Sequence, residues 1–366
     1  MKKRIFSIIA LMLVSLFTLS ACDGCSSLPT LKFNNGFYGL SEEEPRTYYT
    51  ETLTYDVNYA ESFEGINLSP KLKDDENVSF EFKDGSYVST LKVYKGFQEA
   101  GEDNGVEIKS DIIENLKEDE QNAFHLHTEF SIKAKYVVNG KTTENDEKII
   151  SDAFFLKTAL SFAPVYTKTK ASYLQFYSSI GEVIKVESES ETTYQNNSYT
   201  TWRKITGNKA SEETTTEQKY SLKSVIDNAQ LLFALRNFDV EFEKVDTLAV
   251  VSPNYEAPTT LAVNYSKNFT VPYTVEKPLT YSNSVTDTFV NLESTVETKQ
   301  YAFYKNDSKE TGTRQTVFIQ SKVESSPLNY LALPIRYIEP LTTYGNFLPM
   351  GVLDYTLTSV NIQIGK

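Results

Sequence analysis

The sequence predicts a mainly β protein, built on a long curved antiparallel sheet, half-barrel or sandwich-like, with one packed α-helix around residues 224–237. Three observations support this fold class. Several segments alternate apolar and polar residues with a period of two, as half-buried strands do. Turn-forming pairs such as Asn139-Gly140 follow some of these segments. Only one segment shows clear helical spacing of its apolar residues.

The first predicted strand begins at Tyr49, where the period becomes two. One of its faces carries Leu53, Tyr55, Val57 and Tyr59. The same alternation returns at Val78, Phe80 and Phe82. We expect the residues Lys83-Asp84-Gly85-Ser86 to form a hairpin turn into a further strand, Tyr87–Tyr94.

The clearest strand is Phe124–Val138, which ends at Asn139-Gly140. At roughly 3.3 Å per residue it would span about 50 Å, far longer than a typical strand. A second long arm, Val183–Tyr194, is expected to turn at residues 195–198 and return through Trp202 to Ile205. A further strand is expected over Thr214–Leu222.

The predicted helix begins at Ser224 or Asp227, either of which can act as its N-cap, and ends at Asn237. Its helical spacing comes from Val225, Ile226, Ala229, Leu232, Phe233 and Leu235. The segment Ile149–Phe162 fits a second helix, capped by Ser151 or Asp152, and fits a continuous buried strand nearly as well.

The C-terminal third returns to strands after a Pro-containing stretch, residues 252–260, where the body could divide into two domains. Gln315–Ser321 and Leu353–Leu357 have the best strand patterns. The apolar phase then moves from odd to even positions, since Val360, Ile362 and Ile364 follow. That shift requires a β-bulge or a change of sheet near Thr358.

The chain opens with a basic segment, Met1-Lys2-Lys3-Arg4, and an uncharged apolar run, Ile5–Leu19. This length is short for a membrane span and right for a signal peptide. The residues Leu19-Ser20-Ala21-Cys22 resemble the lipobox of bacterial lipoprotein precursors. The resemblance implies that the Cys22 thiol receives a diacylglyceryl group and that the signal peptide is cleaved just before it.

This reading divides the chain into a signal peptide (1–21), a lipidated tether (22–45) and a β-rich extracytoplasmic body (46–366). The new amino terminus can be acylated too, for example with palmitate. Each buried CH₂ contributes roughly 0.8 kcal/mol, so two or three acyl chains would hold the protein at the cell membrane on its extracytoplasmic face. In bacteria that sort lipoproteins, Asp23 after the modified Cys indicates retention at the inner membrane.

Charge and cysteine content narrow the possible partners. The net charge of the chain is −13, and loss of the three cations of the signal peptide (Lys2, Lys3 and Arg4) leaves −16. Such a charge argues against binding nucleic acid or gripping anionic lipid electrostatically. Of the two cysteines, Cys22 is committed to lipid, so Cys25 has no intrachain disulfide partner.

Two rows of side chains could ligate a metal. His125 and His127 share one strand face, roughly 7 Å apart, and Glu129 extends the row. These are zinc ligands by type, but Ser131, Lys133 and Lys135 lie on the same face, which favours its being the solvated side of the sheet. Glu187, Glu189 and Glu191 could bind calcium, although a solvated strand edge that discourages aggregation fits them better. We therefore expect no metal and no cofactor.

Catalytic motifs do not occur: the sequence has no GxSxG, no Gly-rich phosphate loop and no HExxH. A Ser or Cys nucleophile would need a histidine, and the two histidines lie together on a strand expected to be exposed. We therefore expect that the protein is not an enzyme.

Aromatic residues are the remaining feature, with 24 Tyr and 22 Phe against one Trp. Most of them fall on the strand faces expected to be buried. The order of a first strand, long hairpins and a helix over residues 48–240 resembles LolA/LolB-like half-barrels, which carry lipids or lipoproteins across an envelope. This resemblance implies a lipid or other apolar envelope ligand bound between sheet and helix. The alternative is a structural or partner-binding envelope lipoprotein; the residues that bind a ligand are not predicted.

Overall fold

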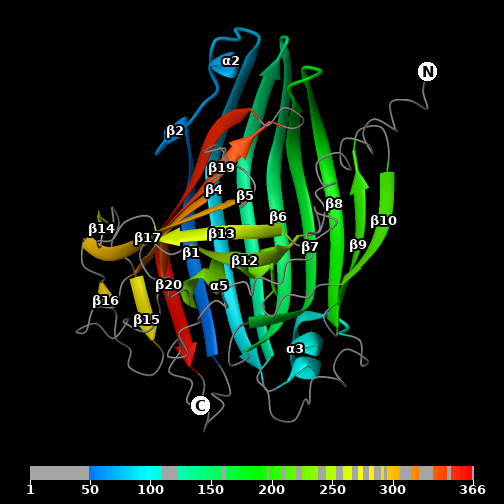
Figure 1. The fold of residues 1–366 in the computed structure, drawn as a ribbon, viewed down its shortest axis with the longest axis vertical. Helices are drawn as coiled ribbons and strands as arrows, with labels where there is room; N and C mark the ends of the chain where they lie inside the picture. The colour runs from blue at the N-terminus through cyan, green and yellow to red at the C-terminus, as the bar shows by residue number, and fades with distance from the viewer. Residues whose placement is uncertain are drawn as a thin grey trace.

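Long antiparallel strands dominate the computed structural model, which describes these residues (Figure 1): 49–94, 96–108, 123–157, 162–195, 198–207, 211–219, 225–237, 245–252, 259–265, 271–274, 280–283, 290–291, 295–305, 315–320, 333–343 and 348–364.

Eight strands pair antiparallel with their neighbours in one series: β1 (Tyr49–Ala60), β4 (Val78–Tyr94), β5 (Ala123–Val138), β6 (Lys141–Lys157), β7 (Phe162–Tyr177), β8 (Glu182–Gln195), β9 (Ser198–Thr206) and β10 (Ser211–Lys219). The series continues beyond β1 through antiparallel pairs, in the order β20 (Pro349–Ile364), β19 (Pro334–Thr342), β18 (Gln315–Gln320), β17 (Thr295–Lys305), β13 (Thr259–Tyr265) and β12 (Val245–Val251). The sheet remains open.

The far end of this series folds back, and β12 and β13 run across the front of the long strands (Figure 1). β11 (Val225–Asp227) pairs parallel with β12. Shorter elements complete the structure: β14 (Val271–Thr274), β15 (Thr280–Asn283), β16 (Val290–Asn291), the hairpin of β2 (Ser62–Phe63) and β3 (Ile66–Asn67), α2 (Pro70–Lys73) and α3 (Phe97–Asn104). The result is sandwich-like, because one curved sheet supplies both layers.

The main predicted strands are confirmed. β1 and β5 match the first and clearest predicted strands, and Asn139 and Gly140 form the turn after β5 with φ of 52° and 75°. The predicted arm and return correspond to β8 and β9, and β10 follows them.

The hairpin predicted at Lys83–Ser86 is wrong, because β4 continues through it as one strand. β5 is long enough to pair with both halves of β4, so the turn residues become a β-bulge between Lys83 and Ser86. Asp84 has a φ of 51°. A Cβ on Gly85 would lie 2.2 Å from the Val57 carbonyl oxygen, so only glycine allows this approach.

The predicted helix lies in its expected place but is shorter. β11 occupies Val225–Asp227, and the helical segment consists of η4 (Asn228–Gln230), α5 (Leu231–Ala234) and η5 (Leu235–Asn237). The Asp227 carboxylate accepts a hydrogen bond from the Ala229 amide at 2.8 Å, which makes Asp227 the N-cap. The other proposed cap, Ser224, lies outside the described residues.

The strands decide two points that the sequence left open, namely the structure of the segment after Ile149 and the nature of the phase shift near Thr358. Ile149–Lys157 is part of β6, so the strand alternative is right for these residues and the helix alternative is wrong there, but the strand is not continuous to Phe162, which begins β7. In β20 the register against β1 shifts between Thr54 and Tyr55, which leaves Thr358 as the extra residue. Its hydroxyl donates to the Thr54 carbonyl at 3.0 Å, so the predicted bulge is confirmed.

The possible domain split at residues 252–260 falls mostly outside the described residues. The strands on either side of it, β12 and β13, pair with each other over Val245–Val250.

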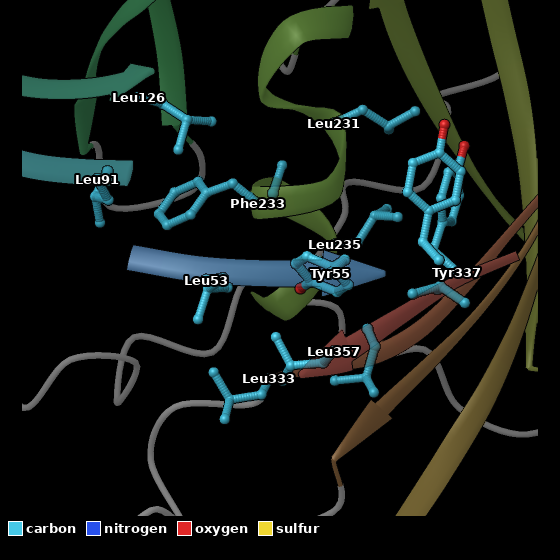
Figure 2. Packing of buried hydrophobic residues seen from close by; sticks show 14 of the residues in the cluster. Leu53, Tyr55, Leu91, Leu126, Leu231, Phe233, Leu235, Leu333, Tyr337 and Leu357 are labelled. Carbon is cyan, nitrogen blue, oxygen red and sulfur yellow. The ribbon is translucent and has the colours of Figure 1, made fainter. Parts of the chain in front are cut away.

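The main core lies between the curved sheet and the layer in front of it. Figure 2 shows Phe233 of α5 directed toward Leu91 and Leu126 of the long strands, with Leu235 and Tyr55 beside it. Rings pack closely here, since the Phe155 and Phe233 centroids lie 5.3 Å apart. Strands β17, β18 and β19 close the other side of this core, to which they contribute Tyr301, Phe303, Val317, Ile319, Ile335 and Tyr337.

A buried ion pair fixes the helical segment to β1. The Arg236 guanidinium donates to both carboxylate oxygens of Glu51, at 2.5 and 3.0 Å, and both side chains are at most 2% exposed. The guanidinium also lies 5.7 Å from the Phe233 ring centroid. Two fully desolvated charges are tolerated only with such bidentate geometry.

Removing one charge of this pair should destabilise the protein strongly. Arg236→Met leaves the Glu51 carboxylate buried without its cation, and we expect a loss of about 3–5 kcal/mol in urea unfolding. The double variant Glu51→Leu/Arg236→Met should recover most of that loss. Lys135→Met, which breaks an exposed pair with Glu144, is the control and should have a much smaller effect. Equal losses in the single and double variants would contradict the role of the ion pair.

Candidate functional site

The two faces of the long sheet differ in chemistry. On β5 the inner face, toward β12 and β13, carries Leu126 and Phe130, and the outer face carries His125, His127 and Glu129. In the register of β5 and β6, His127 lies opposite Asp152, and His125 lies opposite Phe154. The structure therefore places the three predicted metal candidates around an aspartate of the neighbouring strand.

His127 lies between two carboxylates. Its Nδ1 is 2.8 Å from Asp152 Oδ1, and its Nε2 is 3.1 Å from Glu129 Oε1. Because ionised carboxylates only accept hydrogen bonds, both bonds form when both ring nitrogens carry a proton. The hydrogen bond to Asp152 raises the pKa of His127 above its usual value, and the bond to Glu129 adds to this against the effect of burial.

His125 is not on a solvated surface, so the sequence-based placement is wrong at this residue. It is 2% exposed, and its ring stacks on Phe154 with 4.5 Å between centroids. Helix α3 lies over this end of β4 and β5, where Phe97 and Ala100 pack with Tyr94 and Phe154. Helix α3, which the sequence did not predict, therefore covers the outer face at the lower end of the long strands in Figure 1.

Asp152 joins the two histidines, since its Oδ1 is also 2.9 Å from His125 Nε2. Burial raises the pKa of Asp152, but the hydrogen bonds from both histidines outweigh it and hold that pKa well below the usual range. Within the described parts of the chain, no three or more His, Cys, Asp and Glu residues are grouped so that they could hold a metal ion. The arrangement is a hydrogen-bonded ion cluster.

The acidic row of β8 does not lie on a sheet edge, because β7 and β9 pair with β8 on either side. Lys168 Nζ is 2.7 Å from Glu191 Oε1, and Lys170 Nζ is 3.3 Å from Glu189 Oε1. The expectation of an edge is therefore wrong. Cross-strand ion pairs with lysines of β7 account for these two acids.

The inner face carries a group of tyrosines around a carboxyl. The Tyr355 hydroxyl donates to Glu339 Oε2 at 2.9 Å, and the Tyr355 ring packs against Tyr337 and Tyr87 with centroids 5.3 and 5.8 Å away. Burial raises the pKa of Glu339, and the bond from Tyr355 only partly offsets this. A carboxyl in such surroundings favours its neutral form more than an exposed one does.

Sequence analysis missed Asp152, Glu339, Glu51 and Glu147 as site residues. Two of them gave a usable signal, since Glu51 and Glu339 stand at positions where the period-two pattern calls for an apolar residue, whereas Glu147 stands in the polar run 141–148, which has no such alternation. Such interruptions mark carboxyls on the core-facing side of a strand. Asp152 gave no signal of its own, because its role depends on the pairing of β5 with β6.

The lipidation site Cys22 and the tether residue Cys25 lie outside the described residues. In the portion of the chain that is described, no helix is both long enough and apolar enough to cross a membrane.

Comparison with protein-family models, with curated proteins and with solved structures gave no match in any of the three cases.

The pKa of His127 tests the ion cluster. A raised pKa in the folded state means that His127 contributes stability below its unfolded pKa of about 6.5, and that this contribution is lost as pH rises through the folded pKa. Because the site is half exposed, we expect His127→Gln to cost on the order of 1 kcal/mol or less near pH 6 and still less near pH 9. NMR titration should give a raised pKa that falls in Glu129→Gln and falls further in Asp152→Asn. A His127 pKa at or below 6.5 in the unaltered protein would contradict the geometry.

Proposed function

We propose that this protein is a lipid-anchored bacterial envelope lipoprotein that acts by binding a partner protein, without catalysis. The lipobox-like residues Leu19-Ser20-Ala21-Cys22 support the anchor and its place on the extracytoplasmic face of the cell membrane. The observation that supports a protein partner rather than a small ligand is the close packing between the long sheet and the layer in front of it, which consists of β12, β13 and the helical segment.

A carrier of lipid needs an enclosed space lined by apolar side chains. Here the corresponding position is occupied by contacts between the two layers. Phe233 packs on Phe155 and Phe162, with centroids at 5.3 and 5.0 Å, and Leu231, Ala234 and Leu235 are at most 7% exposed. A ligand at this level would have to displace the core, which favours a role for the outer surfaces.

The outer face offers a broad surface for a partner. Its side chains alternate in charge across β4–β8, as in the pairs Lys133–Asp84 and Lys148–Glu129 at 2.7 and 3.4 Å. Such exposed pairs contribute little stability and exchange readily with the charges of a partner.

A second function, binding of a lipid or another apolar envelope molecule, rests on a specific observation at the upper end of the inner face. Tyr59, Phe80 and Phe82 are only half-buried there, and Ile149 is 36% exposed. These aromatic and aliphatic side chains offer an apolar molecule a partly accessible surface on the inner face.

No enzymatic role is proposed. The described hydrogen-bond partners of His125 and His127 are carboxylates, so neither histidine is paired with a hydroxyl or thiol nucleophile in the way that acyl-transfer catalysis uses.

The anchor is tested with a matched pair of cysteine variants. Cells fed an alkyne-labelled palmitate should label the unaltered protein and Cys25→Ser, and should not label Cys22→Ser. Only Cys22→Ser should leave the membrane fraction, because it lacks the acyl chains. Label retained in Cys22→Ser, or lost in Cys25→Ser, would refute lipidation at Cys22.

The choice of ligand is tested on mature Cys22→Ser protein. Native mass spectrometry should give the apo mass, with no uptake when envelope lipids are added. In cells, a photo-crosslinker at exposed Lys170 on the outer face should capture one defined protein, and the same group at inner-face Ile149 should not. A stoichiometric lipid that is lost in Phe82→Glu would instead establish the carrier function.

A further inference from the structure

The β6–β7 ladder ends before either strand does. The last cross-strand pair is Lys148 with Ser172, although β6 begins at Lys141 and β7 continues to Tyr177. Beyond this point β7 stays paired with β8 only, down to Tyr177 and Glu182. Residues Leu174–Val186 therefore form a two-stranded arm, here called the β7–β8 arm.

The β7–β8 arm leaves the plane of β6 and packs over the upper inner face. Leu174 and Phe176 join a core with Ala134 and Tyr136 of β5, and the rings of Phe176 and Tyr136 lie 6.4 Å apart. Strand β8 lies against β5, although β6 and β7 stand between them in the sheet order. At the tip, the Ser178 and Thr343 hydroxyls are 3.1 Å apart.

Glu147 stands at the hinge of this arm. Where the ladder ends, its Oε1 accepts a hydrogen bond from the Leu174 amide at 2.9 Å, in place of a backbone carbonyl of β6. It occupies an inner-face position of β6, opposite Ile132 of the core. A carboxyl has thus replaced the backbone acceptor that would otherwise join the arm to the sheet.

The surroundings of Glu147 disfavour its charge. From β5 the Tyr136 phenol faces it. Its sequence neighbours Asp146 and Lys148 project from the opposite face of β6, and on the arm Lys185 pairs with Glu187 at 3.4 Å. Burial raises the pKa of Glu147 to about 7, against the hydrogen bond from Leu174, and no lysine or arginine of the described residues contributes to the shift.

We propose that the β7–β8 arm is a proton-sensitive flap, which protonated Glu147 holds closed over the upper inner face and ionised Glu147 releases. Release brings water to the carboxylate, which restores its solvation. It also uncovers the inner-face side of Tyr136 and the half-buried aromatic residues beside it. The flap does not depend on the lipid anchor or on the identity of the partner.

Hydrogen exchange on mature Cys22→Ser protein tests the flap. The usual pKa of a glutamate is near 4.5, and the closed arm raises that of Glu147 to about 7. The closed state therefore binds the proton more tightly. The stability that proton binding adds to the closed state is complete below pH 4.5 and is lost as pH rises to 7. Arm opening should increase by up to about tenfold per pH unit in that window and level off above it, after correction for intrinsic exchange.

The variant Glu147→Gln keeps an oxygen acceptor for Leu174 and cannot ionise. Its arm amides should be protected at pH 8 at least as strongly as those of the unaltered arm at pH 5.5, with no dependence on pH. Glu144→Gln, on the same strand but exposed and paired with Lys135, is the matched control and should retain the original profile.

The amides of β4 and β5 near Leu91 and Leu126 serve as internal references, since they belong to the main core. Constant arm protection in the unaltered protein between pH 5 and 8 would overturn the proposal, even if Glu147→Gln failed to fold. A pH profile that persists in a folded Glu147→Gln would overturn it as well.

Discussion

The structure depends on covering one face of a sheet of very long strands. Alternation along β1, β4 and β5 places mostly apolar side chains on the inner face, and such a face cannot remain in water. The chain solves this by continuing the same sheet past β20 until β12, β13 and the helical segment lie across its own inner face (Figure 1). The Glu51–Arg236 pair then links the two layers through a bidentate contact between desolvated charges.

The inner and outer faces handle charge in opposite ways. Several outer-face acids pair with lysines or histidines of a neighbouring strand, as Glu191 does with Lys168 and Asp152 does with His127. On the inner face Glu51 has an arginine, whereas Glu147, Glu339 and Asp227 receive hydrogen bonds from an amide or from hydroxyl groups. Burial raises the pKa of each of these three carboxyls. These interior carboxyls therefore make the packing of the core sensitive to pH, and the exposed ion pairs of the outer face are sensitive to salt.

The sequence was informative wherever structure follows from local pattern. Period-two alternation located β1 and β5, the turn residues Asn139-Gly140 were read correctly, and the phase change near Thr358 predicted a bulge. The sequence was misleading where the local conformation or burial depends on an element that is distant in the chain. Lys83–Ser86 has turn chemistry, but β5 pairs with both sides of it and converts the turn into a bulge. His125 has polar neighbours along its strand, yet α3, which has no strong apolar spacing, covers it. The site residues Asp152 and Glu147 act through cross-strand contacts, which one sequence does not encode locally.

The two proposed functions, binding of a protein partner and binding of an apolar molecule, require different parts of the structure. In the centre, rings from α5 and the long strands are in direct contact, so a ligand there would cost the contacts that hold the layers together. At the upper end, the cover over Tyr136 is the β7–β8 arm. The Glu147–Leu174 hydrogen bond joins it to β6 where their ladder stops, and side-chain packing and a hydroxyl contact at the tip also attach it. Cover of this kind opens at lower free energy than a continuous ladder does. Among the described residues, the inner face beneath the arm is therefore the more favourable place for an apolar molecule, whereas a protein partner can use the outer face with the arm closed.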